Sequence, residues 1–149
     1  MLLSIQGSLQ MRNIQDIKKE IESSSNYSSF KELIIEEQEV LRVELNDYKE
    51  LYVYLTLSGE ELICSACILS QEEIVEGKIA ELHELLLELN MDMPLSAFSK
   101  NKDRYVIYGS LISDSKIEHI IEEIEILCFN AVEVIEFLYQ KEFLKNDED

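Results

Sequence analysis

The segment LYVYLTLSGEELICSACIL, residues 51–69, decides the fold class of this chain. Aliphatic residues occupy every second position of its first half, at Leu51, Val53, Leu55 and Leu57. This period of two is typical of a half-buried β-strand. Ser58-Gly59 then predicts a tight hairpin turn. The second half is apolar on both faces, which predicts a strand that is central in its sheet or covered on both sides.

A further strand is expected just before this segment. Leu41, Val43 and Leu45 also alternate with charged residues, and Asn46-Asp47 is a turn signal. Three consecutive strands joined by such short turns must form an antiparallel meander.

The first third of the chain predicts one helix and a loop. Apolar residues spaced by three and four over residues 9–22 indicate an amphipathic helix, with Gly7 and Ser8 before it. The Ser-rich stretch 23–29 predicts a loop. Residues 30–36 have an ambiguous pattern that is compatible with one helical turn.

A second helix is expected after the meander, over about residues 71–90. Ser70 and Glu73 have the spacing of a capping box, and Pro94 forbids the helix from continuing. Gly77 would lie inside this helix, where glycine costs roughly 1 kcal/mol relative to alanine and marks close packing.

The last third predicts two strands and a long helix. Leu95 to Phe98 is a short strand, residues 99–103 are a polar turn, and residues 104–111 are a second strand. Ser115 and Glu118 form another capping box, and the helix after them meets no Gly or Pro as far as Leu144.

The resulting order is α-β-β-β-α-β-β-α, which predicts a single α+β domain with an antiparallel sheet flanked by helices. Residues 1–36 supply the N-terminal helix and Ser-rich loop, and residues 145–149 are expected to be a frayed acidic tail.

Charge and cysteine content exclude several classes. The 149 residues carry 13 Lys and Arg against 31 Asp and Glu, a net charge of −18. Nucleic-acid binding and anionic membrane surfaces are therefore disfavoured, whereas a partner with a basic segment is attracted. Negative charge that simply maintains solubility is the alternative. Three cysteines, no apolar run near ~20 residues and no signal-peptide pattern predict a protein of the reducing cytoplasm without membrane insertion.

No catalytic or cofactor motif is recognisable. Cys64 and Cys67 lie three apart in a strand, so they point to opposite faces and are interpreted as structural. His83 is expected to pack at a boundary and His119 to be exposed. A His119–Glu123 pair would bind a metal only weakly. No cofactor is predicted.

Three features are candidates for binding a protein partner. Met91 and Met93 lie in the short segment before Pro94, and methionine suits adaptable surfaces, although core filling is the alternative. Tyrosines on two strands would form an aromatic sheet surface, unless they pack beneath a helix: Tyr52, Tyr54, Tyr105 and Tyr108. Glutamates on the last helix would form a docking strip, or a solvated face: Glu118, Glu122 and Glu125.

Several segments, taken in their order along the chain, resemble the YjfI-like family of bacteria: residues 93–98, 103–111, Ser115 and 122–130. The matching features are a Pro-Leu-Ser segment, a Tyr-x-x-x-Gly-x-Leu strand and a final helix with Glu-Ile and an Asn. This resemblance implies a bacterial cytoplasmic protein of unassigned biochemistry. Family members are often encoded near phage-shock-protein-A-like membrane-stress proteins, which implies a regulatory partner of that kind.

The element order is also similar to that of type III secretion chaperones and their YbjN-like relatives. That likeness implies a small, acidic, non-enzymatic and usually dimeric protein. Four matched residues have structural explanations: Pro94 fixes the helix exit, Gly109 permits close backbone approach or a bulge, Ser115 caps the last helix, and Asn130 makes hydrogen bonds if buried.

The leading hypothesis is a non-enzymatic, homodimeric protein-binding module with a chaperone or adaptor role. The alternatives are a regulatory partner of a phage-shock-protein-A-like protein, an enzyme or small-ligand binder with a pocket, and a metal sensor.

Overall fold

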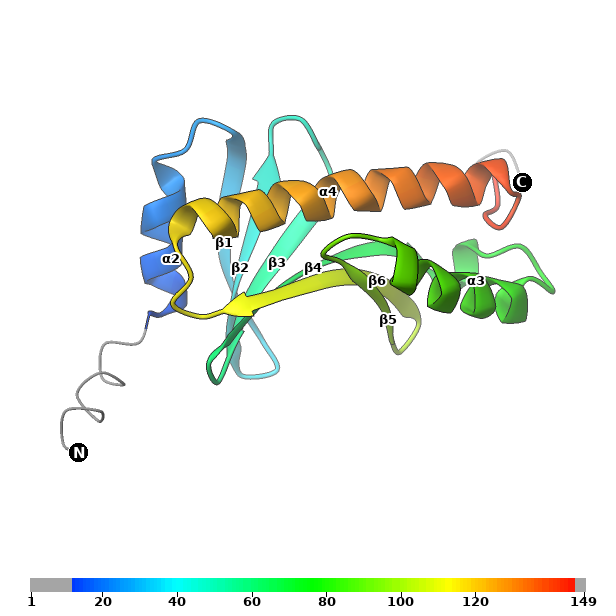
Figure 1. The fold of residues 1–149 in the computed structure, drawn as a ribbon, viewed down its shortest axis with the longest axis horizontal. Coiled ribbons are helices and arrows are strands. Elements are labelled where there is room, and N and C mark those ends of the chain that lie inside the picture. Colours follow the sequence, from blue (N-terminus) through cyan, green and yellow to red (C-terminus); the bar gives the residue numbers. More distant parts are fainter. Residues whose placement is uncertain (1–11, 147–149) are drawn as a thin grey trace. The chain divides into compact units, whose positions relative to one another are not determined.

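The computed structural model describes residues 12–146. Its strands form a six-stranded sheet in the order β1-β2-β3-β4-β6-β5 (Figure 1). The predicted α+β class with an antiparallel sheet and helices is confirmed. The elements, with their bounds, are α2 (Ile14–Glu22), β1 (Tyr27–Ile35), β2 (Gln38–Leu45), β3 (Tyr52–Ser58), β4 (Glu61–Ser70), the 3-10 helix η1 (Gln71–Glu73), α3 (Ile79–Asp92), β5 (Ala97–Asn101), β6 (Arg104–Ile112) and α4 (Ile117–Gln140).

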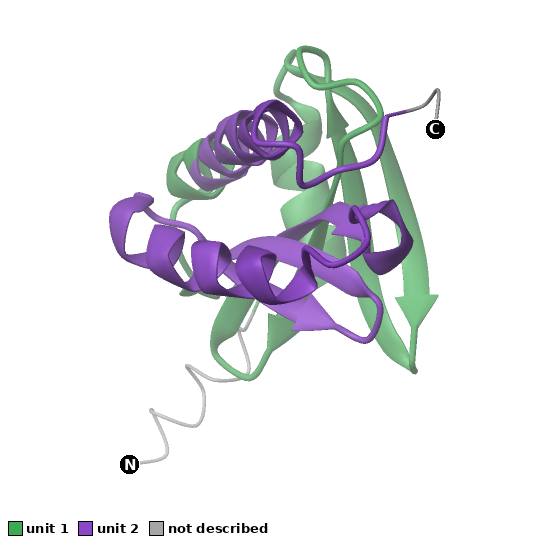
Figure 2. Cartoon of the chain, turned by 90° about the vertical axis from the view of Figure 1, so that its right-hand side faces the viewer, with its two compact units in different colours: residues 1–64, 110–122 green, residues 65–109, 123–149 purple. Residues whose placement is uncertain are grey.

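The chain divides into two compact units (Figure 2). Unit 1 comprises residues 1–64 and 110–122, and unit 2 comprises residues 65–109 and 123–149. The strands β4 and β6 and the helix α4 each contribute residues to both units.

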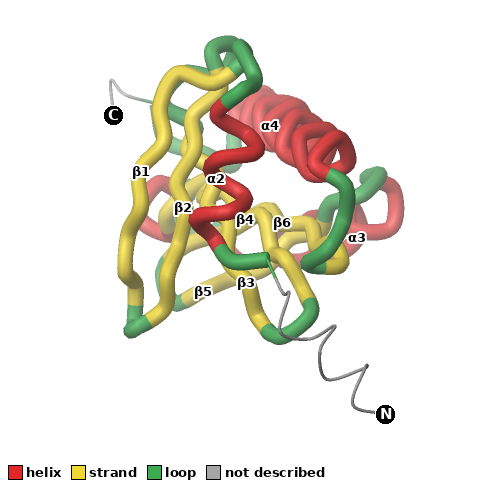
Figure 3. Tube along the Cα trace, turned by 90° about the vertical axis from the view of Figure 1, so that its left-hand side faces the viewer, coloured by secondary structure: helices red, strands yellow, loops and turns green. Residues whose placement is uncertain are grey.

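In unit 1, the amphipathic helix α2 contacts β2 and β3 (Figure 3). Its apolar face is the predicted one, since Ile14, Ile17 and Ile21 are all buried. The helix begins at Ile14 rather than near residue 9, because Asn13 is its N-cap. The Asn13 side chain accepts from the Asp16 N–H at 2.8 Å, and the Asp16 carboxylate accepts from the Asn13 N–H at 3.0 Å. The part of the predicted helix before Arg12 lies outside the described residues.

The predicted alternation of the meander is confirmed. Leu41, Val43 and Leu45 of β2 and Val53 and Leu55 of β3 are all buried. Leu57 is half-buried, and Leu51 precedes β3.

Residues 27–35 form a strand that the sequence did not reveal. β1 pairs antiparallel with β2 from Tyr27 opposite Leu45 to Ile35 opposite Gln38. The predicted loop is therefore confined to residues 23–26, and the ambiguous residues 30–35 are strand rather than a helical turn. Its exposure does not alternate cleanly, because β1 is an edge strand with few buried side chains. The connecting residues Glu36 and Glu37 have φ of 50° and 68°, a conformation for which Asn and Gly are the usual signals.

In unit 2, the second helix starts later than predicted. The Glu73 carboxylate accepts from the Ser70 N–H at 2.6 Å, as in a capping box, but only the three residues of η1 follow. Gly77 has a φ of +84° and lies in the turn between η1 and α3, so the prediction that it lies inside a helix was wrong. The left-handed conformation at Gly77 separates the two helices. The helix α3 ends at Asp92, before Pro94 as predicted.

The β5–β6 hairpin is also displaced from its prediction. β5 begins at Ala97, not Leu95, and includes residues 99–101, so the turn is confined to Lys102 and Asp103. Lys102 has a φ of +57°, and because this position is not a glycine the sequence did not indicate such a tight turn.

Both ends of α4 differ from the prediction. The first helical carbonyl is that of Lys116, which accepts from the Ile120 N–H, so Ser115 lies one residue before the cap position. The helix ends at Gln140 rather than near Leu144, because Glu142 adopts a φ of +62° and the Phe143 N–H bonds back to the Leu138 carbonyl.

The chain after α4 pairs with the segment that follows η1. Leu144 forms a β-bridge with Ile74, the Val75 N–H donates to the Phe143 carbonyl, and the Lys145 N–H donates to the Glu73 carbonyl. A backbone hydrogen bond thus joins Lys145, the first residue of the predicted tail, to the segment after η1. Residues 147–149 of the predicted tail lie outside the described residues.

Within the described residues, no helix is long and apolar enough to cross a membrane.

Candidate functional site: a groove between α3 and β5

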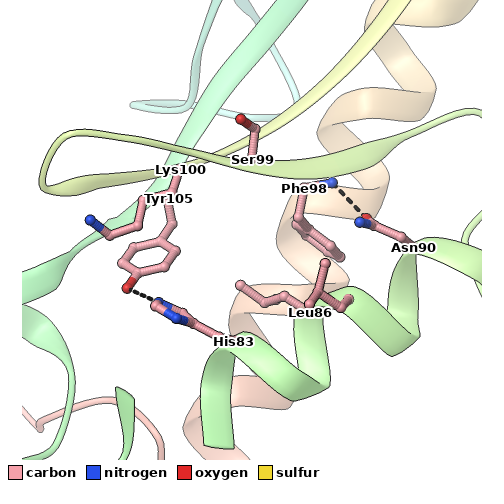
Figure 4. A pocket seen from close by; sticks show the side chains of 8 residues that line it. His83, Leu86, Asn90, Phe98, Ser99, Lys100 and Tyr105 are labelled. Carbon is pink, nitrogen blue, oxygen red and sulfur yellow. Dashed lines mark hydrogen bonds between the residues drawn. The ribbon is translucent and has the colours of Figure 1, made fainter. Parts of the chain in front are cut away.

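Unit 2 contains an open cavity of about 240 Å³ between α3 and the edge strand β5 (Figure 4). Apolar side chains predominate in its walls, with a few polar groups at the base and ends. We call it the α3–β5 groove, and it is lined by His83, Leu86, Leu87, Asn90, Phe98, Ser99, Lys100 and Tyr105.

The base of the groove is a histidine–tyrosine pair. Tyr105 of β6 is buried, and its hydroxyl shares a hydrogen bond of 2.6 Å with Nε2 of His83, which is half-buried on α3 (Figure 4). The rings lie 5.5 Å apart. Burial raises the pKa of Tyr105, and the buried phenol hydroxyl needs the hydrogen-bond partner that His83 supplies.

The β5 wall is fixed to α3 at one end. The Phe98 N–H donates to Oδ1 of Asn90 at 2.7 Å (Figure 4). At the other end, the Lys100 ammonium donates to the Lys102 carbonyl and lies 5.7 Å from the centre of the Tyr105 ring. Both contacts hold the β5 wall in position without filling the groove.

The rim on the α3 side exposes large apolar side chains. Leu87 is 69% exposed and Met91, one helical turn later, is 89% exposed. Around the helix beyond this ridge lie exposed acidic side chains, Glu84, Glu88 and Asp92. An exposed apolar ridge with a polar border beside a cavity is characteristic of a binding surface rather than of a solvated face.

The methionines proposed for partner binding occupy different environments. Met91 belongs to the rim of the groove, whereas Met93 is half-buried as the C-cap residue of α3.

The tyrosines do not form one bare aromatic surface. Tyr105 is buried, while Tyr52 and Tyr54 are half-buried on β3 in unit 1. The guanidinium of Arg42 lies 4.2 Å from the centre of the Tyr52 ring, and Arg42 is the cross-strand neighbour of Tyr54. Tyr52 therefore stacks with a cation of its own sheet, and Tyr54 lies opposite the same arginine.

The glutamates of α4 are divided by exposure. Glu118 and Glu122 are exposed in unit 1, and Glu125 is half-buried in unit 2. His119 is exposed and Glu123 is buried, so the two residues of the weak metal pair have different environments. The described residues contain no group of three or more His, Cys, Asp or Glu side chains placed to hold a metal.

Asn130 and Gly109 position the segment that leads into β5. Buried Asn130 donates through Nδ2 to the Pro94 carbonyl and to Oγ of Ser96, each at 3.0 Å. A Cβ placed on Gly109 would lie 1.9 Å from Oε1 of Glu123 and 2.9 Å from the Leu95 carbonyl oxygen. This is the close approach expected of a glycine in a strand.

None of the three cysteines, all within the described residues, forms a disulfide, and two of the thiols have raised pKa values. Cys64 is buried and Cys67 is half-buried, at positions of β4 that alternate in exposure. Burial, with a smaller contribution from Glu125, raises the pKa of Cys128 to about 12. Burial also raises the pKa of Cys67, against the lowering effect of Arg104. Reactive thiolates need a lowered pKa, so these cysteines are poor nucleophiles.

Sequence reasoning missed the groove itself, although a signal was present. Leu85, Leu86 and Leu87 are consecutive on a helix, and successive residues point 100° apart. One helix face cannot bury all three, so at least one leucine had to lie at the margin of the core. His83 and Lys100 gave no comparable signal, because their neighbours in the groove come from other elements.

Comparisons with known structures show the fold. The chain is similar to a chain in the crystal structure of the ExsC–ExsE complex, with 16% identity over 76% of this chain and 84% of that chain, at a TM-score of 0.55. It is similar to YbjN of E. coli, described as a candidate transcription regulator, with 12% identity over 90% and 96% of the two chains and a TM-score of 0.64. A protein from Methanothermobacter thermautotrophicus gives 13% identity over 87% and 97%, at a TM-score of 0.54.

Comparison of sequences gives one family and no individual relative. A family model described as "Uncharacterized protein conserved in bacteria (DUF2170)" matches residues 11–142. No curated protein sequence matches the chain.

Proposed function

The chain belongs to the bacterial family DUF2170, and on that premise we propose that it is a non-enzymatic protein-binding module with a chaperone-like or adaptor role. The observation that carries this proposal is the α3–β5 groove, whose rim exposes Leu87 and Met91 to solvent. Large exposed apolar side chains beside a preformed cavity are stabilised when a partner covers them.

The size and lining of the groove favour a protein partner over a small ligand. Its volume of about 240 Å³ is below the ~300 Å³ at which drug-sized sites usually begin. Its titratable pair, His83 and Tyr105, is occupied by an internal hydrogen bond. An enzyme or small-ligand binder remains the alternative. It predicts saturable binding of a metabolite inside the groove, without displacing a protein bound at the rim.

The structural likenesses are consistent with this class of function. One similar chain was crystallised in a complex named for two proteins, ExsC and ExsE. The sequence resemblance to YjfI-like proteins adds a more specific form of the proposal, in which the partner is a phage-shock-protein-A-like membrane-stress protein.

Two further properties are proposed with the function. Homodimerisation would cover the exposed Ile34 and Ile35 of the edge strand β1, and light scattering that gives twice 17.4 kDa would support it. A cytoplasmic location agrees with three cysteines that form no disulfide in the described part of the chain.

The proposal is tested by comparing partners captured by the wild-type chain with those captured by Leu87→Asp/Met91→Asp. Both side chains are exposed, so the variant is expected to fold, as circular dichroism would verify. A stoichiometric protein lost only from the variant supports the module. The matched control is Ile112→Asp, at another exposed apolar residue, 67% exposed in unit 1. Equal capture by all three proteins would contradict the proposal.

A further inference from the structure

We propose that the α3–β5 groove docks a cationic amphipathic helix of the partner protein. The inference rests on the proposed function and specifies the occupant of that site. The helix would insert an apolar stripe against Leu87 and Met91 and place Lys or Arg side chains along the acidic border of α3.

The order of side chains around α3 defines the surface that the partner meets. At 100° per residue, the pocket-lining Leu86 and Asn90 are followed by Leu87 and Met91, and then by the acidic residues. Leu87 and Met91 are separated by four residues, so they form a ridge parallel to the axis of α3. A second helix with apolar residues at the same spacing packs against such a ridge.

The acidic border makes this surface negatively charged. Glu84, Glu88 and Asp92 are exposed at successive spacings of four, and Glu81 is exposed one turn before. No Lys or Arg occurs in α3. Basic side chains at the same spacing on a facing helix would each lie near one carboxylate, whereas acidic side chains would be repelled.

Lys100 is the cation that lines the groove, and it is already engaged. Its ammonium donates to the Lys102 carbonyl and lies over the Tyr105 ring, on the β5 side. The acidic border lies on α3. The partner's basic side chains therefore belong on the α3 side, away from Lys100, which fixes the orientation of its polar face.

A β-strand is a poorer occupant than a helix. In an antiparallel pair, the backbone N–H and C=O groups of successive residues point alternately toward the neighbouring strand and away from it. The two-residue turn makes Asn101 and Arg104 a hydrogen-bonded pair, so Phe98 and Lys100 present their backbone groups at the free edge of β5. The Phe98 N–H is already bonded to Asn90, so an added strand would lose one of the few donors available.

A second copy of this chain is also a poorer occupant. Two copies docked through α3 would bring two identical acidic borders together, in a molecule of net charge −18. Like charges placed opposite each other across an interface suppress that pairing.

The experiment measures binding of fluorescently labelled model peptides by anisotropy. The first peptide has about 18 residues of Leu and Lys, with Leu at i, i+3, i+4 and i+7, so that it forms an amphipathic helix. The second has the same composition in strict alternation and favours a strand. The third replaces every Lys of the helical peptide with Glu. We expect saturable binding of the first peptide, at least about 10-fold tighter than the other two.

Matched charge reversals separate the groove from general attraction to an acidic protein. We compare Glu84→Lys/Glu88→Lys with Glu118→Lys/Glu122→Lys, two pairs of exposed glutamates with the same spacing on different helices. The α3 pair should weaken binding of the helical peptide about 10-fold or more, and the α4 pair much less. Leu87→Asp/Met91→Asp should weaken it by at least as much. Amide NMR shifts on binding should map to α3 and β5.

The outcomes distinguish the inference from the broader proposal. Equal weakening by both charge-reversal pairs means attraction by net charge alone and overturns the inference. Tighter binding of the alternating peptide overturns the helix in favour of strand addition, and tighter binding of the Glu peptide overturns the cationic partner. Any of these results is compatible with a captured protein lost from Leu87→Asp/Met91→Asp. The proposed function itself is contradicted only if Leu87→Asp/Met91→Asp captures the same proteins as the wild-type chain.

Discussion

At the scale of single residues, the segment between α3 and β5 depends on one missing side chain and one buried amide. Gly109 leaves space for the Glu123 carboxylate and the Leu95 carbonyl, and the Asn130 amide donates to the Pro94 carbonyl and the Ser96 hydroxyl on either side of Leu95. The wall of the α3–β5 groove begins just after this segment. The residues that make it rigid thus lie outside the groove.

The substitution Gly109→Ala should destabilise the protein by about 1–3 kcal/mol, because its Cβ would overlap Glu123 and the backbone at Leu95. The Glu123 side chain can move, but the Leu95 carbonyl is backbone and has less freedom. The free energy of unfolding in urea measures the effect. Ser110→Ala, at the exposed next residue, is the control and should change stability little.

The thiols provide a second test at this scale. With native protein at pH 8, iodoacetamide should alkylate Cys67 before Cys128, because Cys67 is half-buried and burial raises the pKa of Cys128 to about 12. Unfolding in urea should make all three cysteines reactive, as peptide mass spectrometry would show. Rapid alkylation of Cys128 in the folded protein would contradict its buried position.

The same pKa shift has a consequence for stability at high pH. Burial in the folded protein raises the pKa of Cys128 from the ordinary thiol value of 9.0 to about 12. The folded state therefore retains a proton that the unfolded state loses, and the contribution of Cys128 is complete below pH 9 and declines as the pH rises toward 12.

At the scale of elements, the difference between predicted and observed structure follows from turn chemistry. Strands with one buried face could be predicted, because Leu41 and Val53 belong to clear period-two patterns. β1 could not, because an edge strand needs no such pattern and its turn uses Glu36 and Glu37 at positive φ. The end of α4 was missed for the same reason at Glu142. In each case the backbone adopts a conformation that the local residue type does not favour.

The β1–β2 turn gives a test in which the protein should become more stable. Glu36→Asn/Glu37→Gly places the preferred residues of a two-residue hairpin at two positive-φ positions. We expect a gain of about 1–2 kcal/mol in the free energy of unfolding, since non-glycine residues pay a steric cost in this conformation. Lys31→Gly, at an exposed position inside β1, is the control and should destabilise. A loss of stability in the turn variant would mean that these glutamates make stabilising contacts.

The candidate site could be predicted only in part, because it is assembled from α3, β5 and β6. The sequence indicated Met91, but as one of several adaptable residues. It gave no indication that His83 meets Tyr105, since their pairing depends on which strand lies beneath α3. Residues far apart in the chain become a site only through the topology of the sheet.

At the scale of the whole molecule, charge dominates. A net charge of −18 opposes the compact state through self-repulsion. Raising NaCl from about 0.01 M to about 0.15 M should therefore raise the urea midpoint of unfolding, because the Debye length falls from roughly 30 Å to about 8 Å. An uncharged solute at the same osmolality is the control. A midpoint independent of salt would show that attractive pairs such as Arg12–Glu20 and Lys18–Glu22 balance the excess of carboxylates.

The backbone pairing between Ile74 and Leu144 has a mechanical consequence. An ATP-driven unfolding machine that grips the chain beyond Lys145 must first peel this short contact from the segment after η1. It then pulls on α4, a helix of 24 residues that belongs to both compact units. The applied force therefore reaches early a helix whose residues belong to both compact units. Resistance to processive degradation from this end should depend on α4 rather than on the small contact that precedes it.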